Sequence, residues 1–103
     1  MTYEDRCRAD ARLVILAELA GQEDARLNSR NLAVVVAQVV PRQTDEWLLQ
    51  QLRWLDGMDA LNLSESNLPG LGPVHIATLT RTGRDHVERR RFIPGVSKPA
   101  DEE

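Results

Sequence analysis

The stretch that decides the fold is residues 28–58, NSRNLAVVVAQVVPRQTDEWLLQQLRWLDGM. Asn28 or Ser29 predicts a helix start, because a short polar side chain accepts hydrogen bonds from the unpaired amides of a first turn. Pro41 predicts the end of that helix, since proline cannot continue one. Between them the apolar residues recur at helical spacing, at Leu32, Val35, Val36, Val39 and Val40.

The valine run 34–36 leaves an alternative open, because β-branched residues also suit a buried strand. The helical spacing and the polar cap favour the helix. Thr44 then predicts the cap of a further helix, along which Leu48, Leu52 and Leu55 form an apolar spine at four- and three-residue steps. The stretch therefore predicts two short helices joined by a tight turn at 41–43.

The flanking sequence adds a helix before this pair and a hairpin after it. A helix is expected over 3–20, ending at Gly21, with Leu13, Leu16 and Ala20 on its core face. After residue 60 apolar and polar residues alternate at 61–63 and again at 74–76, which predicts a β-hairpin with a long tip over 64–73.

The last part of the chain predicts one more helix and a tail. Thr80 is expected to cap a helix that runs to about Arg91, and Pro94 to stop it. The expected organisation is a single domain over 1–93 and a flexible C-terminal tail over 94–103, since 103 residues are too few for a second core.

The composition fits a globular domain in a reducing compartment. The chain is 42% apolar and 28% charged, and Cys7 is its only cysteine, so no internal disulfide forms. We expect a cytoplasmic protein, because no stretch has the length of a membrane span and the N-terminus has no apolar leader.

Two segments resemble the winged helix-turn-helix family. Residues 52–61, LRWLDGMDAL, resemble the segment in which two leucines close the recognition helix and an apolar pair begins the wing. Residues 79–83, LTRTG, resemble the Leu-Thr-x-x-Gly segment that follows the wing in bacterial members, including the ArsR-like and MarR-like groups. In that segment Thr80 is expected to cap a helix, and Gly83 to let it pass close to a neighbouring element.

The fold class that this resemblance implies is mostly α with a small β-hairpin (α+β). It is a winged helix-turn-helix with a three-helix core, a wing and a C-terminal helix. The chain departs from family usage at Asp59-Ala60, where many members have Gly-Leu. The turn into the wing is therefore expected to differ here.

A narrower resemblance involves both ends of the chain. Residues 12–16, RLVIL, and 93–99, IPGVSKP, resemble a group of small winged-helix proteins of Mu-like prophages, often labelled ArsR-like regulators. This likeness implies a phage-encoded, DNA-binding regulator of transcription that works as a homodimer in the cytoplasm of a bacterial host.

The resemblance also implies which residues face double-stranded DNA. The expected DNA-binding residues lie on the turn and the recognition helix: Arg42, Gln43, Thr44, Leu49, Gln50 and Arg53. Of these, Gln50 is suited to read adenine, and Arg53 to hold a phosphate or a guanine.

Charge is unevenly distributed along the chain. The net charge is −3, yet residues 78–98 carry six cations against two carboxylates, a local balance of +4 that leaves −7 for the rest. Further basic contacts to DNA are expected from Arg30, Arg81, Arg84, Arg89, Arg90 and Arg91. An alternative is that the last three simply complement a helix C-terminus. The final helix is a further candidate for dimer contact, through Val87, Phe92 and Ile93.

An alternative function is a module for protein assembly that does not bind DNA. Asp45 and Glu46 would oppose phosphates, and Leu49 suits a protein surface better than a base edge. The expected wing tip, 64–72, holds Glu65 and no lysine or arginine, whereas a wing in a minor groove usually offers a cation. The Asp45/Glu46/Leu49 face would then bind a protein partner.

Metal and catalytic sites are not expected. Cys7, His75 and His86 are isolated in sequence, so they form no ligand cluster of the kind that metal sensing needs. The chain has no phosphate-binding loop, dinucleotide fingerprint or HExxH segment, and we expect neither a cofactor nor an enzyme.

Overall fold

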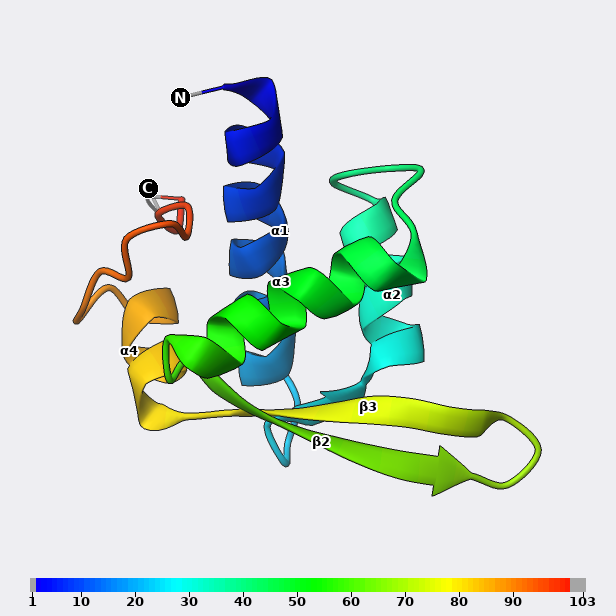
Figure 1. Ribbon diagram of the computed structural model, residues 1–103. Helices are drawn as coiled ribbons and strands as arrows, with labels where there is room; N and C mark the ends of the chain where they lie inside the picture. The colour runs from blue at the N-terminus through cyan, green and yellow to red at the C-terminus, as the bar shows by residue number, and fades with distance from the viewer. Residues whose placement is uncertain (1, 101–103) are drawn as a thin grey trace.

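A computed structural model describes residues 2–100 of the chain. Within this part, four helices and a three-stranded antiparallel sheet form an α+β fold with a layout compatible with a winged helix. In chain order the elements are α1 (Tyr3–Ala20), β1 (Arg26–Asn28), α2 (Ser29–Ala37), α3 (Asp45–Gly57), β2 (Leu61–Leu68), β3 (Gly72–Leu79) and α4 (Arg81–Val87). Figure 1 shows α1, α2 and α3 on one side of the sheet, with α4 at one end of α3.

The helix starts are set by the predicted caps. The Asn28 side chain accepts a hydrogen bond from the amide of Asn31, and Thr44 accepts one from the amide of Trp47, both at 3.0 Å. α2 runs from Ser29 to Ala37, so the valine run 34–36 is helical and the strand alternative is wrong. The helix over 3–20 with its cap at Gly21 is also confirmed.

The N-terminus of α1 has a reciprocal cap that the sequence reading did not include. The Thr2 hydroxyl accepts from the amide of Asp5, and the Asp5 carboxylate accepts from the amide of Thr2. Arg8 also donates to Asp5. Hydrogen bonds from Arg8 and Thr2 hold the pKa of Asp5 below its usual value.

The sheet differs from its prediction in two ways. The predicted long tip over 64–73 is wrong: β2 and β3 pair along their full lengths, from Leu61 opposite Leu79 to Leu68 opposite Gly72, so the tip is only 69–71. In addition β1, which was not predicted, pairs with β3 in the order β1-β3-β2. The polar residues 64–67 belong to a strand because they pair with residues 73–76 of β3.

Two helices end earlier than predicted. α2 ends at Ala37, although Val40 beyond it is still buried. α4 ends at Val87 and does not reach Arg91, because Arg89 adopts a left-handed conformation with φ 65°. That conformation lets the amide of Arg90 bond back to the carbonyl of Asp85 at 2.8 Å, which closes the helix end.

The predicted close passage at Gly83 is confirmed. A Cβ added to Gly83 would lie 2.1 Å from the carbonyl oxygen of Ala60. Thr80 caps α4 by accepting from the amide of Gly83 at 3.1 Å, and its hydroxyl donates to the carbonyl of Asp59 at 2.6 Å. The start of α4 is thus fixed against the turn that follows α3.

The segment after α4 packs on α1, in contrast to the loose tail expected from residue 94. Ile93 and Val96 are buried, and the amide of Ser97 donates to the carbonyl of Ala9 at 3.2 Å. Two buried apolar side chains, this main-chain bond and a bond from the Ser97 hydroxyl to the Asp10 carboxylate at 2.5 Å hold the segment. Residues 101–103 of the expected tail lie outside the described residues.

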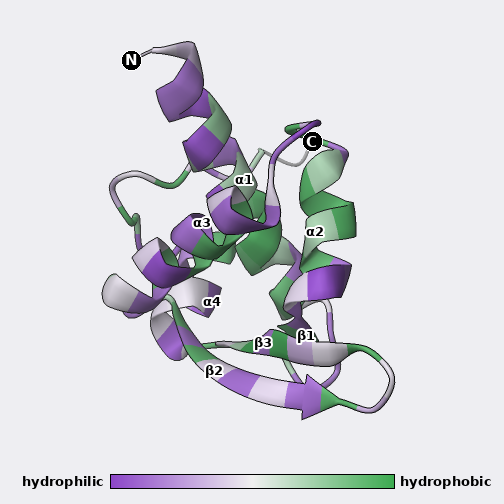
Figure 2. Cartoon of the chain, turned by 45° about the vertical axis from the view of Figure 1, so that its right-hand side comes forward, coloured by the Kyte–Doolittle hydropathy of each residue, from purple (hydrophilic) through white to green (hydrophobic). Residues whose placement is uncertain are grey.

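The core is aliphatic and lies between the three long helices and the sheet. Fully buried leucine and isoleucine side chains fill it: Ile15, Leu16, Leu19, Leu32, Leu52, Leu55 and Leu61. The predicted spine of α3 is therefore core. Figure 2 shows hydrophobic ribbon over much of α2 and mainly hydrophilic or intermediate ribbon along β2. Val34 on α2, and Val39 just after it, nevertheless remain exposed.

Candidate binding surfaces

The predicted DNA-binding residues lie on and before the outward side of α3, which we call the α3 face. It comprises Arg42, Gln43, Thr44, Leu49, Gln50 and Arg53. Leu49 is half-buried and the other five are exposed. Residues 49, 50 and 53 lie together because side chains three and four apart share one side of a helix.

Three arginines near α3 have no internal partner. Arg30, Arg42 and Arg53 are exposed, and within residues 2–100 none of them makes an ion pair or a side-chain hydrogen bond. Arg30, predicted as an outlying basic contact, belongs with the α3 face because it lines a groove with Asp45 and Glu46. These guanidinium groups can meet an anion without breaking an internal bond.

The start of α3 forms one wall of this groove, which we call the α3–β3 groove. Its volume is about 320 Å³. It is lined by Ser29, Arg30, Asp45, Glu46, Leu48, Leu49, Leu52, Pro73, Val74 and His75. The Ser29 hydroxyl accepts from the amide of His75 at 3.1 Å, which fixes α2 against β3.

The rim of the groove carries mainly negative charge, from two carboxylates of α3. Asp45 and Glu46 lie in the first turn of α3, are exposed, and make no ion pair within the described residues. Across the groove, the Nε2 atom of His75 lies 3.5 Å from the Glu65 carboxylate. The carboxylates of α3 are therefore available to a cationic partner and would repel a phosphate.

The remaining predicted basic contacts lie elsewhere. They are Arg81, Arg84, Arg89, Arg90 and Arg91. Together with Lys98 we call them the basic end, which belongs to α4 and the segment after it, beside the C-terminal end of α3 (Figure 1). Carboxylates of the same region neutralise part of it, because Arg90 lies 2.6 Å from Glu88, and Arg84 lies 3.9 Å from the same side chain.

The expected dimer surface of the last helix is largely internal. Ile93 is buried and Val87 is half-buried against the core, whereas Phe92 is 51% exposed. Ile93 and Val87 are therefore largely unavailable for a dimer contact, and the dimer stays a prediction. Phe92 alone presents a large apolar side chain here.

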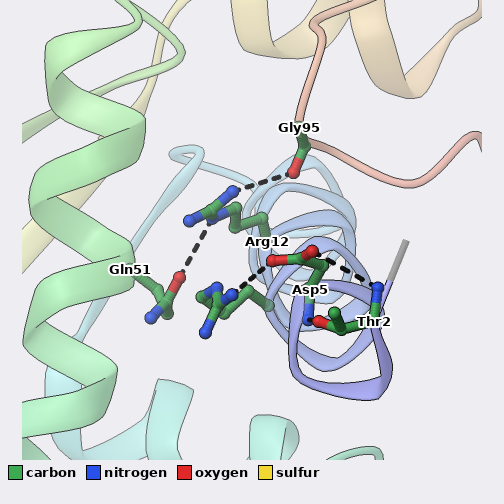
Figure 3. Close-up of polar contacts among 6 residues, drawn as sticks. Thr2, Asp5, Arg12, Gln51 and Gly95 are labelled. Atoms are coloured by element: carbon green, nitrogen blue, oxygen red, sulfur yellow. Dashed lines mark hydrogen bonds and ion pairs between the residues drawn. The ribbon is translucent and has the colours of Figure 1, made fainter.

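A polar network that sequence reasoning missed joins α1, α3 and the C-terminal segment. Arg12 donates from Nε to Gln51 Oε1 and from Nη1 to the carbonyl of Gly95, both at 3.0 Å (Figure 3). Its guanidinium lies 3.8 Å from the centroid of the Trp54 ring. Burial lowers the pKa of Arg12, with a further contribution from the nearby charge of Arg8.

This network connects the two segments of the narrower resemblance, 12–16 and 93–99. Gly95 allows the contact, since its φ is 95° and an added Cβ would lie 2.7 Å from the Trp54 ring. The only advance signal was that both segments resembled the same group of proteins.

His86 also serves the structure. It is 1% exposed; its Nδ1 accepts from the amide of Ile93 at 3.0 Å, so Nε2 carries the hydrogen and donates to the carbonyl of Ser97 at 2.9 Å. The ring therefore holds the C-terminal segment in place.

No group of three or more potential metal-ligating side chains comes together within residues 2–100. None of the helices in this part is long and apolar enough to cross a membrane.

Comparisons with known proteins give no match, whether to family models, to curated proteins or to solved structures. The likeness to winged-helix and prophage proteins stays a prediction from the sequence.

Proposed function

We propose that this chain is a winged-helix, DNA-binding regulator of transcription whose α3 face contacts double-stranded DNA. The order of helices and strands and the sheet order β1-β3-β2 are compatible with that family's layout. In such domains a helix enters the major groove and a hairpin lies beside it. α3 and the β2–β3 hairpin would take these roles.

The observation that carries the proposal is the set of three unpaired arginines near α3. Arg30, Arg42 and Arg53 are exposed and have no carboxylate partner in the described chain. Binding to phosphates therefore breaks no internal ion pair, unlike binding through Arg84 or Arg90 of the basic end. Gln50 lies beside this set, where it can meet a base edge.

The carboxylates of Asp45 and Glu46 limit the strength of this contact. They place two negative charges at the start of the helix that would enter the groove. We expect weak binding with a steep salt dependence: three neutralised phosphates give a slope of roughly −3 in log affinity against log salt.

Fluorescence anisotropy with a labelled random duplex tests the proposal. The double variant R42A/R53A should bind roughly tenfold more weakly at low salt, with the slope reduced by about 2. R81A/R84A is the matched control, because it removes the same charge at the basic end. Absence of binding at micromolar protein and low salt would contradict the proposal, as would a loss confined to the control.

A second candidate function is protein assembly through the α3–β3 groove. The observation that favours it is an apolar lining, with Leu48, Leu49 and Val74, beneath exposed carboxylates that have no internal ion-pair partner. Leu49→Asp should abolish binding of a partner or a second copy while the circular dichroism spectrum stays unchanged. A variant that keeps every self-contact and partner contact would count against this function.

A further inference from the structure

We infer that the α3–β3 groove takes up the basic end of a second copy of this chain, so that copies associate head to tail. The inference rests on the second proposed function, assembly through the groove, and names the occupant. It does not depend on DNA binding.

The groove supplies an apolar site whose lining carries two carboxylates, of Asp45 and Glu46, against the single guanidinium of Arg30. Leu49 is half-buried and partly accessible from the groove, while Asp45 and Glu46 stand exposed above it. Neither carboxylate has an ion-pair partner in residues 2–100. A volume of about 320 Å³ is in the range of pockets that take up small organic groups. The groove therefore suits an apolar side chain flanked by cations.

The basic end supplies such a group. Phe92 is 51% exposed, and the Nζ atom of Lys98 lies 5.4 Å from the centroid of its ring. Arg91 precedes Phe92 in sequence and is exposed, and its Nη1 donates to the Thr82 hydroxyl at 3.3 Å. Phenylalanine and arginine are both enriched in protein interfaces.

The positions of the two surfaces make the contact intermolecular. The groove is lined by the first half of α3, from Asp45 to Leu52. The basic end belongs to α4 and the segment after it, which lie beside the C-terminal end of α3 (Figure 1). The thirteen residues of α3 span about 20 Å, so Phe92 cannot reach the groove of its own chain. Because the two surfaces differ, the contact is heterologous and leaves a free surface at each end, which allows chains longer than a dimer.

Sedimentation velocity over a concentration series, at low and at high salt, tests the inference. The wild-type protein should form species larger than a dimer as concentration rises, and high salt should weaken them because opposite charges meet. The groove variant D45K/E46K and the basic-end variant R91A/F92A should each weaken self-association at least tenfold. E23K/D24K, with the same charge change as the groove variant in the loop after α1, should associate like the wild type.

Mixing the two variants gives the decisive result. The groove variant keeps an intact basic end and the basic-end variant keeps an intact groove, so the mixture should form a 1:1 dimer that does not grow. Circular dichroism checks that each variant is folded. D45N/E46Q replaces the groove variant if the lysines destabilise α3.

The other outcomes separate the two ideas. If the groove variant reduces association and the basic-end variant does not, the occupant is wrong while assembly through the groove stands. If neither variant changes association, self-assembly does not use the groove, and the proposed occupant is wrong as well. A wild-type protein that stays monomeric at the highest concentration, or a variant mixture without a dimer, overturns the inference.

Discussion

Two consecutive glutamines on α3 lie in opposite environments. Gln51 is 2% exposed; its Oε1 accepts from Arg12 and its Nε2 donates to the carbonyl of Trp47. Gln50 is exposed and makes no side-chain hydrogen bond within the described residues. The inner side of α3 is thus bonded to α1 and the C-terminal segment, whereas the outer side carries polar groups without internal partners.

This difference separates polar residues that hold the fold from those available to a partner. On the inner side, removal of a group leaves another buried group unsatisfied, and that costs stability. On the outer side, water already satisfies each group, so its removal costs little. Stability measurements on matched variants can therefore identify the binding side without knowledge of the partner.

The largest effect is expected for Gly95→Ala, which would disturb the packing of Gly95 against Trp54 on the inner side of α3. The new Cβ would be strained at φ 95° and would lie 2.7 Å from the Trp54 ring, which is packed against Arg12. We expect a loss of about 2–4 kcal/mol in the free energy of unfolding, measured by urea denaturation.

Gly70→Ala is the control for Gly95→Ala, because Gly70 has a similar φ of 79° but no atom within 4 Å of an added Cβ. It should cost about 1 kcal/mol. Equal losses for the two variants would show that the contact with Trp54 contributes nothing.

Arg12→Ala should cause the next largest loss in the free energy of unfolding. It removes the donor to Gln51 and Gly95 and the cation above Trp54, and we expect a loss of about 1–3 kcal/mol by the same measurement. Arg6→Ala, an exposed change on the same helix, should cost less than about 0.5 kcal/mol. If Arg12→Ala lowers the free energy of unfolding no more than Arg6→Ala does, the network of Arg12 does not stabilise the fold.

A small gain is expected at the end of α3. Asp59 has φ 61°, a left-handed conformation that glycine adopts without strain, and it is the position where the resembled family often has glycine. Asp59→Gly should raise the free energy of unfolding by roughly 0.5–1 kcal/mol. Destabilisation would instead mean that the Asp59 side chain supports the turn.

The smallest effects are expected on the outer side. Gln50→Ala and Arg53→Ala should each change the free energy of unfolding by less than about 0.5 kcal/mol, because neither side chain has an internal partner. Thermal and urea denaturation both measure this. A loss above 1 kcal/mol at either position would break the distinction between the two sides.

The helices were predictable where local chemistry determines them. Asn28, Thr44 and Thr80 cap the helices that they were expected to cap, and the leucine spine of α3 is core, because caps and helical spacing act within a few residues. The end of α4 was missed because Arg89 adopts the left-handed conformation that ends the helix. Glycine usually occupies such a position, so an arginine there gives no sequence signal.

The other misses involve contacts between distant residues. β1 has three residues, too few to show alternation, and exists because it pairs with β3. The C-terminal segment is ordered by bonds to α1, among them one between Arg12 and Gly95, which lie 83 positions apart in the sequence. The exposure of the α3 face followed from helical spacing, but the groove beside it requires β3, which no local pattern places there.

One measurement tests most directly whether the outer side of α3 is the DNA-binding surface. Amide chemical shifts of the ¹⁵N-labelled protein are followed by NMR as a short random duplex is added at low salt. We expect shifts concentrated at residues 42–53 and near Arg30, with residues 84–98 unchanged. Shifts confined to 84–98, or none at a large excess of duplex, would contradict this expectation.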